Sequence, residues 1–270
     1  KSFKRLGQKA KQVPDAAARD VLARRPIPFD GNTEASLLSA VKLYLAIREE
    51  IDAEGGVVGS GLNCLNESFH CDTTPCLAWD LLYEDRKLIW ACEADTLSML
   101  SLYVLHDTLQ ERVMMSNIYS FLMGNAAIKH EKIDRFPEVP EPENHMLMVH
   151  CGSFGLLPRA FSSRWTLRPK VLAIVDENAH MMDARMAEGP YTLAKVHPQM
   201  DRIQVEPAEL EGYVQYPGTD CRNGALLKVR DGHALMKSWS SHHNCLVGGT
   251  RLVEIDIAAR AVGIRMERIG

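Results

Sequence analysis

The 270-residue sequence lacks the features that would assign it to a protein class directly. It has no apolar run near the ~18 residues of a membrane span. It also has no basic run long enough to bind nucleic acid or a lipid surface. No CxxC pair occurs among its cysteines, which argues against a zinc ribbon. The absence of a Walker A loop, a GxGxxG after a strand, a GxSxG elbow and an HExxH pair leaves no short catalytic motif.

The composition is that of a soluble globular protein of one or two domains, with 46% hydrophobic residues, 24% charged residues and a net charge of −4. Seven cysteines, an odd number without clustering, predict reduced thiols in a cytoplasmic protein. They are Cys64, Cys71, Cys76, Cys92, Cys151, Cys221 and Cys245. The polar start lacks a signal-peptide core and a methionine, so we expect a processed form or a piece of a longer protein.

The first half of the chain alternates between helical and strand patterns, which predicts an α/β sandwich portion over residues 1–143. Apolar residues at helical spacing predict helices over 14–25 and 32–54, and Gly55 and Gly56 end the second. Short apolar runs predict strands at 57–63, 87–92 and 112–121, with a helix over 93–110 between the last two. Glu93 and Asp95 would lie in the first turn of that helix, where the helix dipole favours carboxylates.

A charged, proline-rich stretch at 130–145 predicts a linker, and the pattern changes after it. Short strands separated by turn residues predict a mostly antiparallel, β-barrel-like domain over residues 144–270. The expected strands are 145–151, 170–175, 191–196, 201–206, 212–216 and 225–230. A helix over 250–262 and a strand over 264–269 are expected to close the chain.

Polar residues stand where several expected strands end. They are Glu93, Asp95, Asn117, His150, His242 and His243. Each has a structural alternative, since acids favour a first helical turn, asparagine caps or turns, and a histidine can be satisfied in a core. Together, carboxylate, imidazole and amide oxygen form a donor set for a hard or borderline divalent cation. Alternation along a strand would let only one histidine of the adjacent pair face such a site.

Four blocks occur in the order ACEADTLSML, MSNIYSF, MVHCGS and SWSSHHNCLVGGTRLVEIDIAARAVGI. In this order they resemble the carboxy-terminal half of the L-fucose isomerase and L-arabinose isomerase family. That family has a T/C-E-x-D stretch opening a helix, a Phe-Ala-Asp-Val-like strand, and a Trp-x-x-Asn-His-Gly stretch leading to a closing helix. The spacing of 24 residues from Glu93 to Asn117 is also that of the family. The resemblance covers approximately residues 57–270.

The resemblance implies a metal-dependent aldose–ketose isomerase that works through a cis-enediol, as an oligomer, on a small sugar. Family members hold Mn²⁺ or a similar divalent cation with a glutamate, an aspartate and a histidine. These positions fall on Glu93, Asn117 and His243, and the first two would also be the catalytic pair. The residues expected to contact the sugar are Trp239, His242, His150 and Asp95.

Two departures from the family qualify this expectation. Asn117 replaces the second carboxylate, and a neutral amide can ligate a cation but cannot act as a general base. Glu93 would then move the proton alone, or Asp95 or Glu67 would replace the missing carboxylate. Otherwise the chain is a non-catalytic sugar-binding relative, or a lyase or epimerase on the same scaffold. The family's amino-terminal α/β domain, which helps to close a neighbouring subunit's site, is also absent from the sequence.

Overall fold

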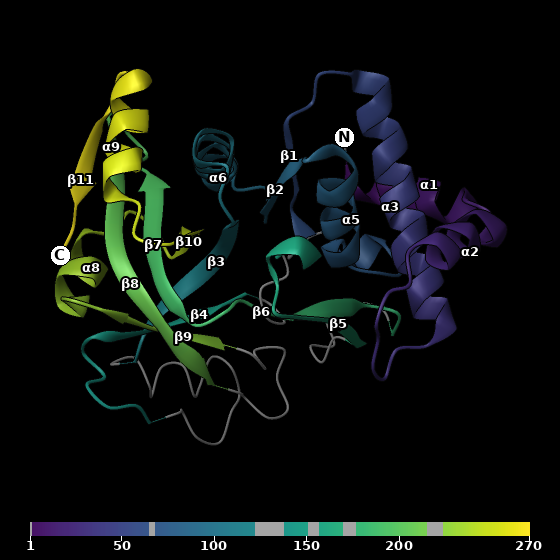
Figure 1. Cartoon of the computed structure of the whole chain (residues 1–270). Coiled ribbons are helices and arrows are strands. Elements are labelled where there is room, and N and C mark those ends of the chain that lie inside the picture. Colours follow the sequence, from purple (N-terminus) through teal and green to yellow (C-terminus); the bar gives the residue numbers. More distant parts are fainter. Residues whose placement is uncertain (1, 65–67, 122–137, 151–156, 170–176, 215–223) are drawn as a thin grey trace.

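A computed structural model of the chain describes residues 2–64, 68–121, 138–150, 157–169, 177–214 and 224–270. Six strands of its largest sheet close into an antiparallel β-barrel, beside which lies a part rich in helices (Figure 1). The expected barrel is therefore confirmed. The expected strand at 170–175 and residue Glu67 lie outside the described residues. None of the described helices is long and apolar enough to cross a membrane.

Three helices form the start of the chain. They are α1 (Phe3–Gln12), α2 (Asp15–Arg24) and α3 (Glu34–Glu54). The side chain of Thr33 caps α3 by accepting the backbone N–H of Ser36 at 3.1 Å. Gly55, at φ 69°, follows its last turn. The helix α1 was not foreseen, because its basic residues mask an apolar stripe on which Phe3 is fully buried.

A short parallel pair of strands follows, made of β1 (Gly59–Leu62) and β2 (Ile89–Cys92). The short helix η1 (Ser68–His70) and the helix α5 (Cys76–Arg86) connect them. After β2 come α6 (Thr96–Leu109) and β3 (Val113–Ser120). The expected strand, helix and strand are all present, but β3 pairs within the barrel instead of with β2. The prediction failed for the partner because periodicity predicts a strand without specifying which strand it pairs with. The parallel α/β unit is therefore β1–α5–β2.

The barrel consists of β3 and five later strands. They are β4 (His145–Val149), β7 (Gly189–Val196), β8 (Arg202–Val214), β9 (Gly224–Val229) and β10 (His243–Gly248). Their order is β8-β7-β10-β3-β4-β9, and pairing of β9 with β8 closes the ring. The expected strands 201–206 and 212–216 are one strand, β8, with an irregularity between Leu210 and Gly212. Such a bulge bends a strand, which lets β8 pair with both neighbours.

The expected closing helix and strand are present as α9 (Leu252–Ala261) and β11 (Arg265–Arg268). The strand β11 lies outside the barrel and pairs in parallel with β8. The helix α8 (Gly232–Ser238) precedes β10. Another antiparallel pair, β5 (Arg164–Pro169) and β6 (His180–Arg185), packs on the helical part. The indole N–H of Trp165 donates to Asp80 Oδ2 at 2.7 Å. His180 Nε2 accepts the backbone N–H of Leu77 at the start of α5, at 3.1 Å.

The chain does not divide at the expected boundary of residue 143. The strand β3 precedes that residue and belongs to the barrel, whereas β5 and β6 follow it and contact α5. One continuous cluster of buried apolar side chains extends from Phe3 in α1 to Ala259 in α9. The helix α6 lies between the barrel and the β1–β2 pair (Figure 1). The two parts therefore share a core, and the start of α6 lies where they meet.

Candidate metal centre

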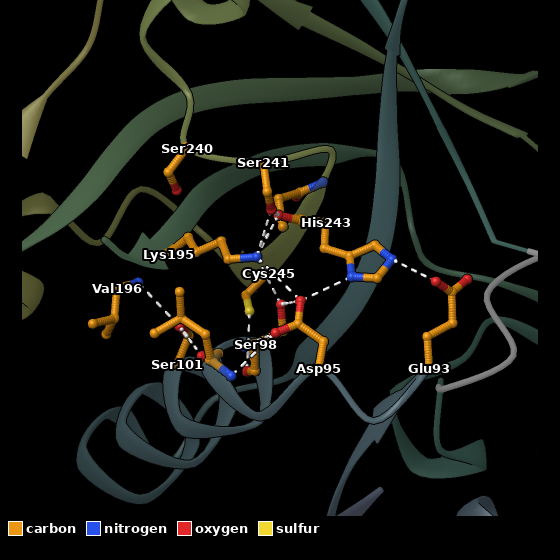
Figure 2. Close-up of polar contacts among 12 residues, drawn as sticks. Glu93, Asp95, Ser98, Ser101, Lys195, Val196, Ser240, Ser241, His243 and Cys245 are labelled. Atoms are coloured by element: carbon orange, nitrogen blue, oxygen red, sulfur yellow. Dashed lines mark hydrogen bonds and ion pairs between the residues drawn. The ribbon is translucent and has the colours of Figure 1, made fainter. Parts of the chain in front are cut away.

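The sequence-predicted polar residues meet at the amino-terminal end of α6. Glu93 and Asp95 follow β2, and His243 begins β10 on the barrel (Figure 2). The backbone N–H of Asp95 donates to the carbonyl of Cys92 at 3.1 Å, which closes a tight turn around Glu93 and Ala94. We expected Glu93 in the first turn of this helix. The helix begins only at Thr96, so Glu93 is instead a residue of the preceding turn.

The turn holds two successive residues in the left-handed region, with φ of 55° at Glu93 and 58° at Ala94. This conformation costs about 1–2 kcal/mol for each residue that is not glycine. Gly61 on β1 packs directly against the turn, where a Cβ would lie 2.8 Å from Ala91 O and 3.2 Å from Ala94 Cα. Close packing thus stabilises a strained turn from which the Glu93 side chain extends toward His243 on β10. Backbone strain of this kind is concentrated at functional sites.

Asp95 organises the surrounding polar groups. Its Oδ1 atom accepts the backbone N–H groups of Leu97 and Ser98 at 3.1 and 3.0 Å, so Asp95 caps α6. Its Oδ2 atom accepts from Ser98 Oγ at 2.7 Å and from His243 Nδ1 at 2.8 Å. Burial alone would raise the pKa of Asp95, but the hydrogen bonds from His243 and Ser98 outweigh burial and hold that pKa well below its usual range. Asp95 is therefore ionised.

Lys195 on β7 is the second charged group beside Asp95, and it is 1% exposed. Its ammonium lies 3.3 Å from Asp95 Oδ2 and donates to Ser98 Oγ at 2.9 Å. It also donates to Ser241 Oγ at 2.7 Å and to the His243 carbonyl at 3.0 Å. The lysine thereby ties α6 to the segment that carries both histidines. Its buried charge is compensated by the Asp95 carboxylate.

His243 is held between two carboxylates. Its Nδ1 atom carries the proton donated to the ionised Asp95, and its Nε2 atom lies 3.5 Å from Glu93 Oε2 (Figure 2). Burial lowers the pKa of His243, but the contacts with Asp95 and Glu93 outweigh burial and raise that pKa to about 9. A carboxylate behind Nδ1 is the usual device that orients a metal-binding histidine and leaves Nε2 for the cation.

Asn117 on β3 is the direct cross-strand neighbour of His243. The adjacent pair, His242 and Ile118, is joined by a hydrogen bond from Ile118 N to His242 O, at 2.8 Å. Asn117 and His243 therefore form the non-hydrogen-bonded pair, in which side chains approach most closely on one face. Asn117 Nδ2 donates to Tyr119 Oη at 3.4 Å. Its Oδ1 atom is buried and accepts no hydrogen bond from the described residues.

Two groups of potential metal ligands share Glu93. In one, ligand atoms of Glu93, His242 and His243 lie within 4.8 Å of one another. In the other, Cys92, Glu93 and His150 do so. His242 is exposed and lies just before β10, and its ring centroid is 4.3 Å from that of His243. Because strand alternation does not yet apply there, both histidines present nitrogen atoms near Glu93.

Two expected sugar-binding residues are placed differently. Both carboxylate oxygens of Asp95 accept hydrogen bonds, so its contacts make it a positioning residue and leave no oxygen for a missing base. Trp239 ends α8 and packs against the shared core. The preceding residue, Ser238, accepts a hydrogen bond from Gln204 Nε2 of β8 at 2.9 Å, so the carboxyl end of α8 lies beside β8.

Sequence reasoning missed Lys195 and Cys92. Lys195 stands alone among apolar residues in YTLAKV, and a single lysine in a buried strand is the signal that would have indicated it. Cys92 immediately precedes Glu93 at the end of β2, where a fully buried strand delivers its last side chain to the turn. No protein-family model matches the chain, and no curated protein matches it either. Its site is therefore interpreted from geometry and chemistry.

We expect Asp95→Asn to lower the free energy of unfolding by about 2–4 kcal/mol, because it leaves the buried Lys195 and His243 without their shared carboxylate. Urea denaturation of the metal-free protein measures the loss. Asp107→Asn, an exposed aspartate on the same helix, is the matched control and should change little. A loss below about 1 kcal/mol, the range of an exposed ion pair, would contradict the central role of Asp95.

The pKa of His243 also predicts how stability depends on pH. Because the folded-state pKa of about 9 exceeds the ordinary value of 6.5, the folded protein binds the proton more tightly. This stabilisation is complete below pH 6.5 and is lost as the pH rises to 9, with a loss of about 3 kcal/mol. Denaturation of metal-free protein at several pH values tests this, with His243→Asn as the reference. An equal decline in both proteins would contradict the assignment.

Proposed function

We propose that this chain holds the metal centre of an aldose–ketose isomerase similar to L-fucose and L-arabinose isomerases. The observation that carries the proposal is the convergence of Glu93 and His243 from separate parts of the fold, with Asp95 behind the histidine. The order and spacing of these residues are also those that the resemblance requires. A carboxylate-oriented imidazole facing a second carboxylate is suited to a divalent cation.

The residues present fit such a cation. Glu93 offers a carboxylate, His243 offers Nε2, and Asn117 offers a buried amide oxygen that accepts no hydrogen bond from the described residues. Oxygen and imidazole donors suit Mn²⁺ or a similar divalent ion, which is the cofactor we propose. When bound, the ion would supply positive charge that stabilises the negative charge developing on the sugar oxygens.

The residues of this chain divide the remaining chemistry among them. Glu93 is positioned to move a proton between C1 and C2 of an open-chain sugar, through a cis-enediol. Asn117 cannot accept a proton, so it is not a general base. The role left to its amide is to hold the sugar in place beside Glu93. His242, exposed beside His243, is placed to contact a sugar hydroxyl. Because Asp95 is already committed to His243 and Ser98, Glu93 is the proposed base among the described residues.

The second candidate is a sugar-binding protein without catalysis. Its support is Asn117, which occupies a position where the resemblance calls for a carboxylate. One carboxylate would then be sufficient to hold a cation and a sugar but would not shuttle the proton. The two candidates differ in one observable, the exchange of the hydrogen at C2 of the sugar with solvent.

We expect purified protein to take up about one equivalent of Mn²⁺ or Co²⁺, and Glu93→Gln and His243→Asn to lose it. Removing a ligand weakens binding because the remaining donors cannot satisfy the cation. Elemental analysis after dialysis measures the metal, and proton NMR in D₂O measures exchange at C2 of pentoses and 6-deoxyhexoses. Asp107→Asn is the control. Equal metal content in all four proteins would rule out the centre, and metal without exchange would favour the binding protein.

We also expect Asn117→Asp to raise Mn²⁺ affinity by about tenfold or more, because it adds a negative charge beside the cation. If the centre is that of an isomerase, the same change should increase C2 exchange by supplying a second carboxylate. Isothermal titration measures the affinity. Asn244→Asp, which changes a buried asparagine that bonds Ser116 O, tests whether any new carboxylate on these strands acts alike. Unchanged affinity in Asn117→Asp would remove Asn117 from the ligand set.

A further inference from the structure

Two buried thiols meet beside the candidate metal centre. The Sγ atoms of Cys64 and Cys92 are 3.1 Å apart, although 28 positions separate the residues in sequence. The parallel pairing of β1 and β2 sets Leu62 opposite Cys92, so Cys64 lies just beyond the paired residues. Cys64 is 8% exposed and Cys92 is 1% exposed. The fold thus brings together two thiols that the sequence gives no reason to pair.

This arrangement differs from that of Cys71 and Cys245. Cys71 Sγ contacts the Asp72 carboxylate at 3.7 Å, and Cys245 Sγ contacts the Ser98 carbonyl at 3.6 Å. The described cysteines are buried, and none of them belongs to a disulfide. A disulfide has a sulfur–sulfur distance of about 2.05 Å. Cys64 and Cys92 would therefore need to approach each other by about 1 Å in total.

The Cys92 thiol also belongs to the group that it forms with Glu93 and His150, whose ligand atoms lie within 4.8 Å of one another. The same sulfur is thus adjacent to two alternatives, a partner thiol and a set of metal ligands. As a thiolate it can ligate a borderline cation, and a disulfide sulfur lacks that charge. These two states of Cys92 exclude each other.

We propose that Cys64 and Cys92 form a redox pair in which oxidation to a disulfide withdraws the Cys92 sulfur from the metal centre and weakens metal binding. The disulfide itself rests on the geometry of the two thiols. Its effect on the metal centre rests on the proposed function, because it requires that Glu93 and its neighbours hold a cation. The pair would make that centre sensitive to peroxides.

The oxidant that the proposal requires is a peroxide. The thiolate of Cys64, the more exposed of the two, attacks one peroxide oxygen and the O–O bond breaks. Hydroxide departs as the leaving group, and Cys64 becomes a sulfenic acid. The Cys92 thiolate then attacks that sulfur, the S–S bond forms, and a second hydroxide leaves. The two thiol protons convert both hydroxides to water. In sum, two thiols lose two electrons and two protons, and hydrogen peroxide becomes two molecules of water.

The first experiment treats the reduced, metal-free chain with one equivalent of hydrogen peroxide and maps its peptides by mass spectrometry without reduction. We expect a linked Cys64–Cys92 peptide that weighs two hydrogens less than its parts and that dithiothreitol separates. Mapping also covers Cys151 and Cys221, which lie outside the described residues. Cys64→Ser should abolish the linked peptide, whereas Cys71→Ser, which removes another buried thiol, should preserve it.

The second experiment titrates Co²⁺ into the reduced and the oxidised protein. We expect the reduced protein to show a thiolate-to-cobalt charge-transfer band, and the oxidised protein to lack that band and to bind at least tenfold more weakly. Dithiothreitol should restore both properties. In Cys64→Ser the reduced protein should keep the band, because Cys92 remains available, whereas Cys92→Ser should lose it.

Each other outcome counts against a stated part of the proposal. Peroxide treatment that leaves the Cys64 and Cys92 peptides unlinked would overturn the redox pair. A linked pair with unchanged Co²⁺ affinity would overturn its control of the centre. Reduced protein that binds neither Mn²⁺, Co²⁺ nor Zn²⁺ would overturn the proposed function and the regulatory effect together. The peptide map alone tests whether the disulfide forms. Failure of the redox pair can therefore be distinguished from failure of the proposed metal centre.

Discussion

The carboxylate of Asp95 is the interaction on which the other features of the centre depend. One oxygen satisfies backbone N–H groups that α6 would otherwise leave unpaired at its first turn. The other receives the Nδ1 proton of His243 and lies beside the Lys195 ammonium. A single side chain thus connects a helix end, a buried cation on β7 and the first residue of β10. Because such networks are polarised in a low-dielectric interior, each contact strengthens the others.

The strained turn before Asp95 has its own place in this arrangement. If Glu93 were inside the helix, its side chain would follow the helix surface. The left-handed conformations of Glu93 and Ala94 instead end β2 abruptly, and Asp95 N returns to the Cys92 carbonyl. Glu93 and Asp95, two positions apart, can then approach different nitrogen atoms of the same imidazole. The cost of the turn is local, and Gly61 packs so closely against it that a Cβ there would lie 2.8 Å from Ala91 O.

Sequence patterns predicted most of the elements and fewer of their partners. The apolar stripe of α3 and its cap at Thr33 are local features, and the short strands of the barrel follow from their spacing. The pairing of β3 with β10 depends on closure of a sheet by strands far apart in the chain, which no local pattern specifies. For the same reason Lys195 was missed, since its partners on α6 and in the histidine segment come from distant parts of the sequence.

The ends of the expected strands indicated the set of polar residues, and the resemblance selected Glu93, Asn117 and His243 from it as metal ligands by their order and interval. It could not indicate that Asp95 is a positioning residue, since that role depends on which oxygen faces which donor. The proximity of Cys64 and Cys92 follows from the parallel register of β1 and β2 and was equally hidden. Site residues could therefore be predicted where the order and spacing of residue types were enough. Contacts that depend on the register of distant strands, such as Cys64 with Cys92, could not be predicted.

Charge balance gives the exchange of a carboxylate for Asn117 a specific consequence. Lys195 lies beside Asp95 on one side of the His243 imidazole, and the Glu93 carboxylate lies on the other side. If a divalent cation binds Glu93, a neutral His243 imidazole and the neutral Asn117 amide, these three donors together supply a single negative charge. Without a thiolate ligand, such a centre would favour a ligand that brings a single negative charge over a neutral one. A sugar that acquires this charge during reaction would be held more tightly than the same sugar before it, which is the direction that catalysis requires.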